Sequence, residues 1–375
     1  MLDLHVFFED TTEILPEHDL GYHDGQIGAH IKLCQNDFTL VESADIVMIG
    51  IGEYRGDGEF HSDNKGVDAI RKQFYQLHYW HKNISIADMG NLKKGAAIKD
   101  SYAALKTVLT ELLKLNKTVV LIGGSHDLTL PQYFAYKDLK KFIDVACVDS
   151  KIDLMKDLAA PAENFLLEML TSDSNYVKHY NHIGFQSYLV HPVLLERMDK
   201  LRFDCFRLGV VKEKMDEMEP VIRNSHLFSF DIRAIKYSDA PANYFSPNGF
   251  TGEEACTLTR FAGMSNKMSS FGIYGYHHAD DVHELTAKQI AQMLWYFVDG
   301  RSKLKNEDTI EDRLSYNEFN TAFAELDTVF LQNKKTNRWW MQLPDKKFTA
   351  CSYNDYVIAS NNQVPERWLR AQERI

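Results

Sequence analysis

Several classes of protein are excluded by what this sequence of 375 residues lacks. Its longest apolar runs, such as VVLIG at 119–123, are far shorter than the ~18 residues needed to span a bilayer. The N-terminus has no basic segment of the kind that opens a signal peptide. The five cysteines are scattered and show no CxxC spacing, which excludes a cysteine zinc site and argues against a disulfide framework. These absences predict a reduced, cytoplasmic protein with no membrane partner.

Basic residues are in the minority. Lysine and arginine total 42 against 53 acidic residues, for a net charge of −11, and no long polybasic run occurs. A nucleic-acid partner is therefore not expected, because such proteins present a basic face. No repeat or low-complexity tract is present either. The composition, 45% hydrophobic and 25% charged, is that of an ordinary globular chain.

Short apolar runs alternate with amphipathic stretches along most of the chain. The runs predict strands at 45–53, 84–88, 117–123, 143–148, 182–187, 206–209, 226–230 and 268–276. The amphipathic stretches predict helices at 66–80, 97–116, 128–137, 163–172, 192–200, 251–263 and 284–299. Strands of continuous apolar character that alternate with helices indicate an α/β fold, with a mainly parallel sheet covered on both faces.

The chain is expected to divide into three parts. Residues 1–44 form an N-terminal segment packed on the core, residues 45–300 form the main α/β domain, and residues 301–375 form a small C-terminal extension. The extension begins with a charged connector at 301–314 and continues with a predicted helix at 317–331 and a predicted strand at 338–343. Its tryptophans are expected to pack it onto the main domain; they are Trp339, Trp340 and Trp368.

Polar residues follow three of the predicted strands, at the sheet edge where parallel α/β folds carry their functional sites. In an extended segment, residues 149, 151 and 153 would point to one side. The three segments that follow these strands are GGSHD (123–127), DSKID (149–153) and DIR (231–233), and each alone is typical of a turn with a helix cap. Together they bring one imidazole and three carboxylates to one edge, donors that suit Mn²⁺, Fe²⁺ or Zn²⁺ and that would repel each other without a cation. The candidate ligands are His126, Asp149, Asp153 and Asp231.

The same motifs, in this order, resemble those of the ureohydrolase superfamily, which contains arginase, agmatinase and formimidoylglutamase. The family patterns GGDHS, DAHxD, SxDxD and GLTxxE correspond here to GGSHD (123–127), DSKID (149–153), SFDIR (229–233) and GFTGEE (249–254). The segment GVDAIR (66–71) is similar to a further family segment, GPxAIR. The formimidoylglutamase-like branch is the most similar.

The resemblance covers roughly residues 45–300 and implies a three-layer α/β/α fold. It also implies two Mn²⁺ ions that share a hydroxide, which attacks a guanidinium or amidine carbon. His126, Asp149, Asp153 and Asp231 match all four protein ligands of one metal site. The second site adds a histidine and an aspartate, which are Lys151 and Arg233 here, and neither can bind a cation in its charged form. Two interpretations stay open: one retained Mn²⁺ ion, or a metal-free cluster in which the two cationic side chains neutralise the carboxylates.

Several further residues have a predicted role. The resemblance implies that Asp153 is the acid/base carboxylate, that Glu254 contacts the substrate amidine, and that Lys151 and Arg233 offer positive charge to a substrate; alternatively, Glu254 is an ordinary helix residue. His277 and His278 suggest either a second metal site or a solvated loop. The glycine-rich stretch 52–58 lacks both nucleotide-binding patterns and is interpreted as a rim loop of the active site.

The sequence leaves two functions open. One is metal-dependent hydrolysis of a linear C–N bond in an amidine or guanidine, such as a formimidoylglutamate-like small molecule. The other is a catalytically silent binding or regulatory module with the same fold. The resemblance also implies a homo-oligomer.

Overall fold

The computed structural model describes residues 4–9, 21–34, 39–58, 64–155, 160–242, 245–323 and 326–372. Within them, nine strands form one parallel sheet in the order β1-β3-β2-β4-β9-β8-β5-β6-β7. Their bounds are β1 Lys32–Leu33, β2 Ile46–Ile51, β3 Ile86–Leu92, β4 Thr118–Ile122, β5 Ile143–Val148, β6 Val177–Phe185, β7 Asp204–Arg207, β8 Leu227–Asp231 and β9 Ser270–Tyr274. The central strands are buried along their whole length, because both sheet faces are covered.

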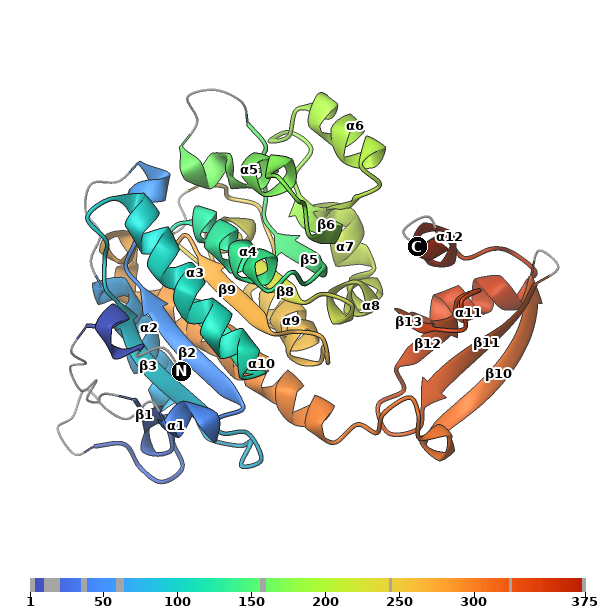
Figure 1. Ribbon diagram of the computed structural model, residues 1–375, viewed down its shortest axis with the longest axis horizontal. Coiled ribbons are helices and arrows are strands. Elements are labelled where there is room, and N and C mark those ends of the chain that lie inside the picture. The colour runs from blue at the N-terminus through green and yellow to red at the C-terminus, as the bar shows by residue number, and fades with distance from the viewer. Residues whose placement is uncertain are drawn as a thin grey trace.

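Helices cover the two faces of this sheet and make three layers (Figure 1). Helices α2, α9 and α10 contribute to the hydrophobic core on one face, and α3, α4 and α5 to the core on the other. None of the helices in the described residues is long and apolar enough to cross a lipid bilayer. The helices of this part of the chain are α1 Thr39–Glu42, α2 Lys65–Gln76, α3 Ile98–Lys114, α4 Thr129–Asp138, α5 Phe165–Thr171, α6 Pro192–Lys200, α7 Leu208–Glu213, α8 Met218–Arg223, α9 Gly252–Gly263 and α10 Leu285–Lys305.

The strand order brings the candidate residues to one place. Strands β4, β9, β8 and β5 are consecutive neighbours in the sheet and all run in the same direction. Their carboxyl ends therefore lie side by side, and the chain leaves these ends with the polar motifs that follow β4, β5 and β8. The parallel α/β fold expected from the sequence is confirmed, and it places these motifs at a single sheet edge.

The C-terminal extension differs from the prediction. Residues 317–331 were expected to form a helix, but the described residues of this range, 317–323 and 326–331, lie in two antiparallel strands, β10 Tyr316–Phe323 and β11 Leu326–Asn333. Phe319 and Phe323 are four positions apart, a spacing that places two residues on the same face of a helix and also of a strand. Strands β12 Trp339–Gln342 and β13 Phe348–Cys351 complete a separate four-stranded sheet, followed by helices α11 Tyr353–Ser360 and α12 Glu366–Gln372.

The tryptophans do not all dock the extension onto the main domain. Trp339 and Trp368 lie in a hydrophobic core of the extension itself, so the prediction for these two was wrong. Trp340 does face the main domain, where the guanidinium of Arg223 lies 4.3 Å from the centre of its ring. The connector is also shorter than predicted, because α10 continues to Lys305.

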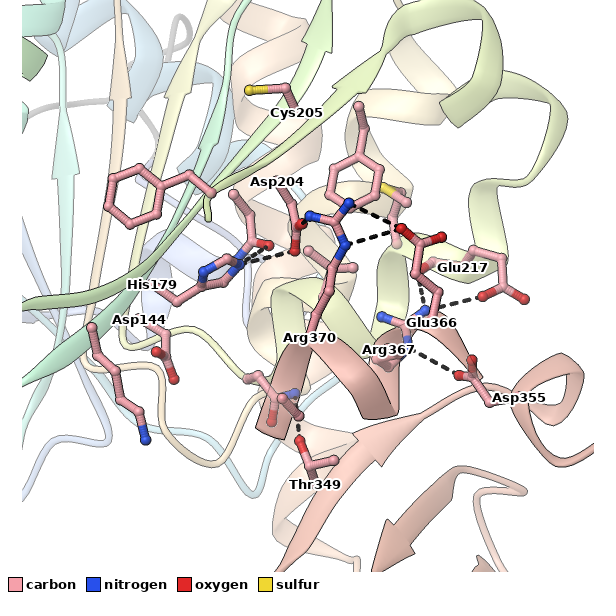
Figure 2. Close-up of a pocket in the computed structure, with 18 of the residues that line it drawn as sticks. Asp144, His179, Asp204, Cys205, Glu217, Thr349, Asp355, Glu366, Arg367 and Arg370 are labelled. Atoms are coloured by element: carbon pink, nitrogen blue, oxygen red, sulfur yellow. Dashed lines mark hydrogen bonds and ion pairs between the residues drawn. The ribbon is translucent and has the colours of Figure 1, made fainter. Parts of the chain in front are cut away.

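A cavity of about 930 Å³ lies between the extension and strands β6 and β7 at the edge of the large sheet. In Figure 2, Arg370 of α12 reaches Asp204 of β7, which also accepts a hydrogen bond from His179. Arg367 pairs with both Asp355 and Glu217 beside it. The extension is thus attached by ion pairs as well as by Trp340. None of the four candidate metal ligands lines this cavity.

Candidate metal centre

His126 stands at the centre of the candidate site. Strand β4 is followed by Gly123 and Gly124, whose φ angles are +88° and +78°. A Cβ at either position would lie within 3 Å of neighbouring atoms, so neither has room for a side chain. This glycine turn delivers His126 as the first residue of a short 3₁₀ helix, with 1% of the residue exposed. Its Nδ1 atom lies 2.9 Å from Asp153 Oδ2 and 3.5 Å from an oxygen of both Asp149 and Asp231.

The other ring nitrogen of His126, Nε2, contacts a buried serine hydroxyl. His126 Nε2 lies 3.0 Å from Ser229 Oγ, which in turn is 2.6 Å from Thr129 Oγ1. The Cys147 sulfur, at 3.6 Å from Nε2, is a weaker partner. If Nε2 keeps its proton and donates it to this hydroxyl, release of the Nδ1 proton leaves a lone pair directed at the carboxylates, which is the state of a histidine that binds a metal ion.

The carboxylates are fixed in a similar way. Oδ1 of Asp149 accepts a hydrogen bond from the Ser150 amide, and Oδ1 of Asp231 accepts one from the Arg233 amide. Their Oδ2 atoms face Nδ1 of the histidine. Asp149 and Asp231 thus each have one oxygen held by the following loop and the other directed toward His126.

The carboxylates of this cluster repel one another, and the repulsion raises the free energy of the folded state unless a positive ion is present. Burial raises the pKa of Asp153, and the charges of Asp149 and Asp231 raise it further. Burial also works to raise the pKa of Asp149, but the hydrogen bond and the charge of His126 outweigh it and lower that pKa. Donor atoms of His126, Asp149 and Asp153 all lie within 4.8 Å of one another. Three buried carboxylates and one imidazole nitrogen suit a divalent cation such as Mn²⁺.

Lys151 and Arg233 occupy different surroundings. Lys151 was expected to neutralise the candidate carboxylates, but its Nζ lies 3.2 Å from Glu163 and 4.4 Å from the centre of the Phe245 ring, with 25% of the side chain exposed. The expected one-sided alternation fails because the backbone bends at residues 150–151. Lys151 therefore lies at the rim of the site.

Arg233 points into the cluster. Burial works to lower its pKa, but the charges of Asp231 and Asp57, followed by those of Asp149 and Asp153, raise it. Its Nη2 donates to Asp57 Oδ1 at 3.0 Å. The guanidinium is thus a positive charge beside the candidate aspartates.

Sequence reasoning missed Asp57 and left the role of His277 open. Asp57 belongs to the glycine-rich stretch after β2, interpreted above only as a rim loop. His277 follows β9 and was interpreted as part of either a metal site or a solvated loop; its Nε2 lies 3.6 Å from Asp57 Oδ2, and 13% of its side chain is exposed. The one available signal was that His277 directly follows the predicted strand at 268–276 and that Asp57 comes four positions after the predicted strand at 45–53.

Glu254 lies in a helix cap. The N-terminus of α9 has a capping box, in which Glu254 Oε2 accepts a hydrogen bond from the Thr251 amide while Thr251 Oγ1 accepts one from the Glu254 amide. The same Oε2 atom pairs with Lys212 at 2.9 Å. The structure therefore places Glu254 in a structural network and shows no contact of its carboxylate with the four candidate ligands.

The residue after His126 is also buried. Asp127 accepts a hydrogen bond from the Tyr102 hydroxyl, and burial raises its pKa to about 6. Gly56 lies against it so closely that a Cβ there would be 1.8 Å from Asp127 Oδ1. Asp127 thus holds the loop after β2 against the loop after β4.

Comparisons with known proteins agree with this architecture. The arginase family model matches residues 44–299, more than half of the chain. A formimidoylglutamase of Hahella chejuensis is 25% identical over 177 residues, which are 42% of this chain and about half (52%) of that relative. A formimidoylglutamase of Staphylococcus haemolyticus is 21% identical over 253 residues, 62% of this chain and 78% of the relative.

Solved structures show the same fold. Formimidoylglutamase from Bacillus subtilis superposes with a TM-score of 0.67 at 14% identity, covering 77% of this chain and 96% of that one. Formiminoglutamase from Trypanosoma cruzi, solved with Mn²⁺, gives a TM-score of 0.63 at 20% identity, covering 70% and 94%. The chain therefore belongs to the arginase family, where its similarities lie with the formimidoylglutamase-like branch.

Proposed function

We propose that this protein binds one divalent cation, Mn²⁺ in the first instance, and hydrolyses a linear C–N bond in an acidic amidine of the formimidoylglutamate type. The observation that carries the proposal is the convergence of three buried carboxylates on Nδ1 of His126. The four residues that would hold the ion are His126, Asp149, Asp153 and Asp231.

A single ion fits the charges better than two. Arg233 is a permanent cation beside Asp231, and Lys151 supplies no ligand. A cation at this place would supply Lewis-acid polarisation of a water and of the amidine. The second position of the family pattern is filled by the chain's own positive charge.

The chain's own groups would bind the substrate and move protons. Asp153 is the proposed acid/base residue, because its carboxylate lies at the common centre, 2.9 Å from His126 Nδ1, where it would face a polarised water. Lys151, partly exposed over Phe245, offers a positive charge at the rim to a carboxylate of the substrate. Glu254 receives no substrate role in this proposal, because its Oε2 atom is used in the cap of α9 and in the pair with Lys212.

A second function is favoured by one observation: the side chains that replace the second ligand pair are both engaged in ion pairs. Arg233 pairs with Asp57, and Lys151 pairs with Glu163. An arginase-fold protein built in this way would bind a ligand or a partner without turning it over.

An assay with several substrates separates the two functions. Purified protein with saturating Mn²⁺ is given formimidoylglutamate, agmatine, arginine and guanidine, and formamide, ammonia and urea are measured at several pH values. We expect product from the acidic amidine and little from arginine or agmatine. Asp153→Asn should lower this activity by about 10²-fold or more, whereas the matched control Asp173→Asn, at an exposed position, should not.

Two results would overturn the proposal. If the metal-loaded protein releases no product from any of the substrates, the chain is the silent module. Arginine turnover near ~10 s⁻¹, typical of an enzyme, would mean that a second cation site is not needed for the family's chemistry. The proposal also includes a homo-oligomer, which light scattering coupled to size exclusion tests directly. No nucleic-acid partner is proposed.

A further inference from the structure

We propose that the cavity between the C-terminal extension and strands β6 and β7 binds a small organic anion that has an apolar body and an N–H or O–H group. This site is separate from the candidate metal centre, because none of the four candidate ligands lines the cavity. The wall that the extension supplies, within residues 343–371, lies outside the arginase-family domain. Binding there does not depend on the proposed hydrolysis.

The cavity has the size and the fixed walls of a ligand site. Its volume is about 930 Å³. Small-molecule pockets have volumes of roughly 300–1,000 Å³ and form preferentially where two domains meet. Arg367 and Arg370 of α12 reach across from the extension and pair with Glu217 and Asp204 of the main domain (Figure 2). These ion pairs hold the two walls together, so the space exists before a ligand enters.

A buried histidine in the lining has an unused ring nitrogen. His179 of β6 is 5% exposed, and its Nε2 lies 3.0 Å from both Asp204 Oδ2 and Asn181 Oδ1. Both partners are acceptors, so Nε2 carries the proton and Nδ1 of the neutral ring is an acceptor. Nδ1 is buried and has no hydrogen-bond partner among the described residues. Because buried polar groups are almost always hydrogen-bonded, an N–H or O–H group of a ligand is the missing partner.

Positive charge collects beside this histidine. Asp144 lies opposite His179 in the neighbouring strand β5, and the Nζ of Lys267 is 4.0 Å from it. Partial burial lowers the pKa of Lys267, Asp144 raises it only in part, and the charge of Lys178 lowers it again. Both lysines line the cavity, so two cations share one aspartate in this corner. A carboxylate, phosphate or sulfonate placed there would balance the excess positive charge.

One small molecule can reach both polar positions. Asp144 and His179 lie side by side in Figure 2 and belong to paired strands, which are spaced about 4.7–4.9 Å apart. Aromatic rings supply the apolar surface: the centre of the Phe203 ring is 6.0 Å from that of His179, and Phe206 and Phe348 also line the cavity. The arrangement suits an apolar body with its anionic group at the lysines and its donor at His179.

The test uses anilinonaphthalene sulfonate, a fluorescent molecule with an aromatic body, a sulfonate and one N–H group. We expect the protein to bind one molecule per chain, measured by fluorescence and isothermal titration calorimetry. The affinity should decrease as NaCl is added, because salt screens the lysine charges. N-acetyltryptophan offers the same groups with a carboxylate and AMP offers them with a phosphate, so the compound that displaces the probe identifies the anion. Inorganic phosphate at the same concentration should not displace it.

Variants with matched controls locate the bound probe. Val210 lines the cavity at a 41% exposed position, so Val210→Trp fills the space and should weaken binding by about tenfold or more. Val193→Trp, at a 39% exposed position outside the lining, should bind like the wild type. His179→Phe removes the acceptor nitrogen and should weaken binding by about 5–10-fold, the contribution of one hydrogen bond, whereas His81→Phe outside the lining should not. Lys267→Met should weaken binding and reduce its dependence on salt.

Three results would overturn the proposal. The first is equal binding of the probe by the wild type and Val210→Trp, which also decides the matter if His179→Phe does not fold. The second is that neither N-acetyltryptophan nor AMP displaces the probe. The third is equal displacement by inorganic phosphate, because the apolar body would then contribute nothing. Displacement by either organic anion, together with weaker binding in Val210→Trp but not in Val193→Trp, is the result that we expect.

Discussion

Replacing Ser229 by alanine tests whether the hydrogen bond to His126 Nε2 fixes the tautomer in which Nδ1 can bind a cation. Ser229 is fully buried in β8, and its hydroxyl is 3.0 Å from His126 Nε2 and 2.6 Å from Thr129 Oγ1. If Nδ1 is the metal-binding atom, Nε2 carries the proton and donates it to this hydroxyl. The substitution removes the acceptor and leaves the imidazole without the contact that selects its tautomer.

Two losses of different kind should follow. A buried N–H left without an acceptor costs roughly 1–3 kcal/mol of the free energy of unfolding, and Cys147, 3.6 Å away, is too weak an acceptor to replace the hydroxyl. Loss of the partner that orients a metal-binding histidine lowers metal affinity by about 10–100-fold, which corresponds to about 1.4–2.7 kcal/mol. We therefore expect Ser229→Ala to weaken Mn²⁺ binding on this scale.

A second buried serine serves as the control. Ser270 in β9 is also fully buried, and its hydroxyl accepts a hydrogen bond from Gln132 at 2.6 Å. Ser270→Ala should lower stability to a similar extent without changing the Kd for Mn²⁺ in isothermal titration calorimetry. If Ser229→Ala binds Mn²⁺ within about twofold of the wild type, the second hydrogen bond of His126 does not prepare a metal ligand.

Three further predictions concern pH, the extension and the helix cap. Burial and three nearby lysines lower the pKa of His226 to about 3, so the folded state disfavours its proton. The free energy of unfolding should therefore fall as pH drops from about 6.5 towards 3. His226→Asn should make this pH dependence weaker in urea unfolding, and an unchanged dependence of stability on pH would contradict the prediction. Arg223→Met removes a buried cation that pairs with Glu219 and donates to the Trp339 carbonyl, which should lower the free energy of unfolding by about 3 kcal/mol or more. The connector after α10 should then be cleaved in limited proteolysis, and a wild-type cleavage pattern would argue against docking through Arg223 and Trp340. Glu254→Gln weakens the cap of α9 and should lower the free energy of unfolding by about 0.5–1 kcal/mol. Its kcat/KM should be unchanged, as in the neighbouring control Glu253→Gln. A fall in kcat/KM that occurs only in Glu254→Gln, at equal Tm, would show that Glu254 contacts the substrate.

The fold was predictable from the sequence because its central strands appear there as continuous apolar runs. Runs such as those of β4 and β8 are mainly apolar and are buried from end to end. Their alternation with amphipathic helices indicates a parallel sheet that is covered on both faces. Carboxyl ends of parallel strands share an edge, so the meeting of His126 with three aspartates followed from strand position alone. The β10–β11 hairpin was not predictable in this way, since its phenylalanine spacing fits either period.

Contacts between loops could not be derived from the sequence. Arg233 and its partner Asp57 are 176 positions apart, and neither strand pairing nor periodicity relates them. Lys151 was misplaced because an alternation rule for extended chain was applied where the backbone bends. Glu254 was given a role by motif similarity, whereas its local contacts are those of a capping box, a pattern that the sequence TGEE already contained.

The central claim is that one cation is held by His126 and the three aspartates that face its Nδ1 atom. Diffraction data from crystals soaked in Mn²⁺, collected on both sides of the manganese absorption edge, test it most directly. The account predicts one anomalous peak per chain, in contact with Nδ1 of His126 and with Asp149, Asp153 and Asp231, and the guanidinium of Arg233 still on Asp57. A site without an anomalous peak, or a peak bound elsewhere in the chain, would contradict it.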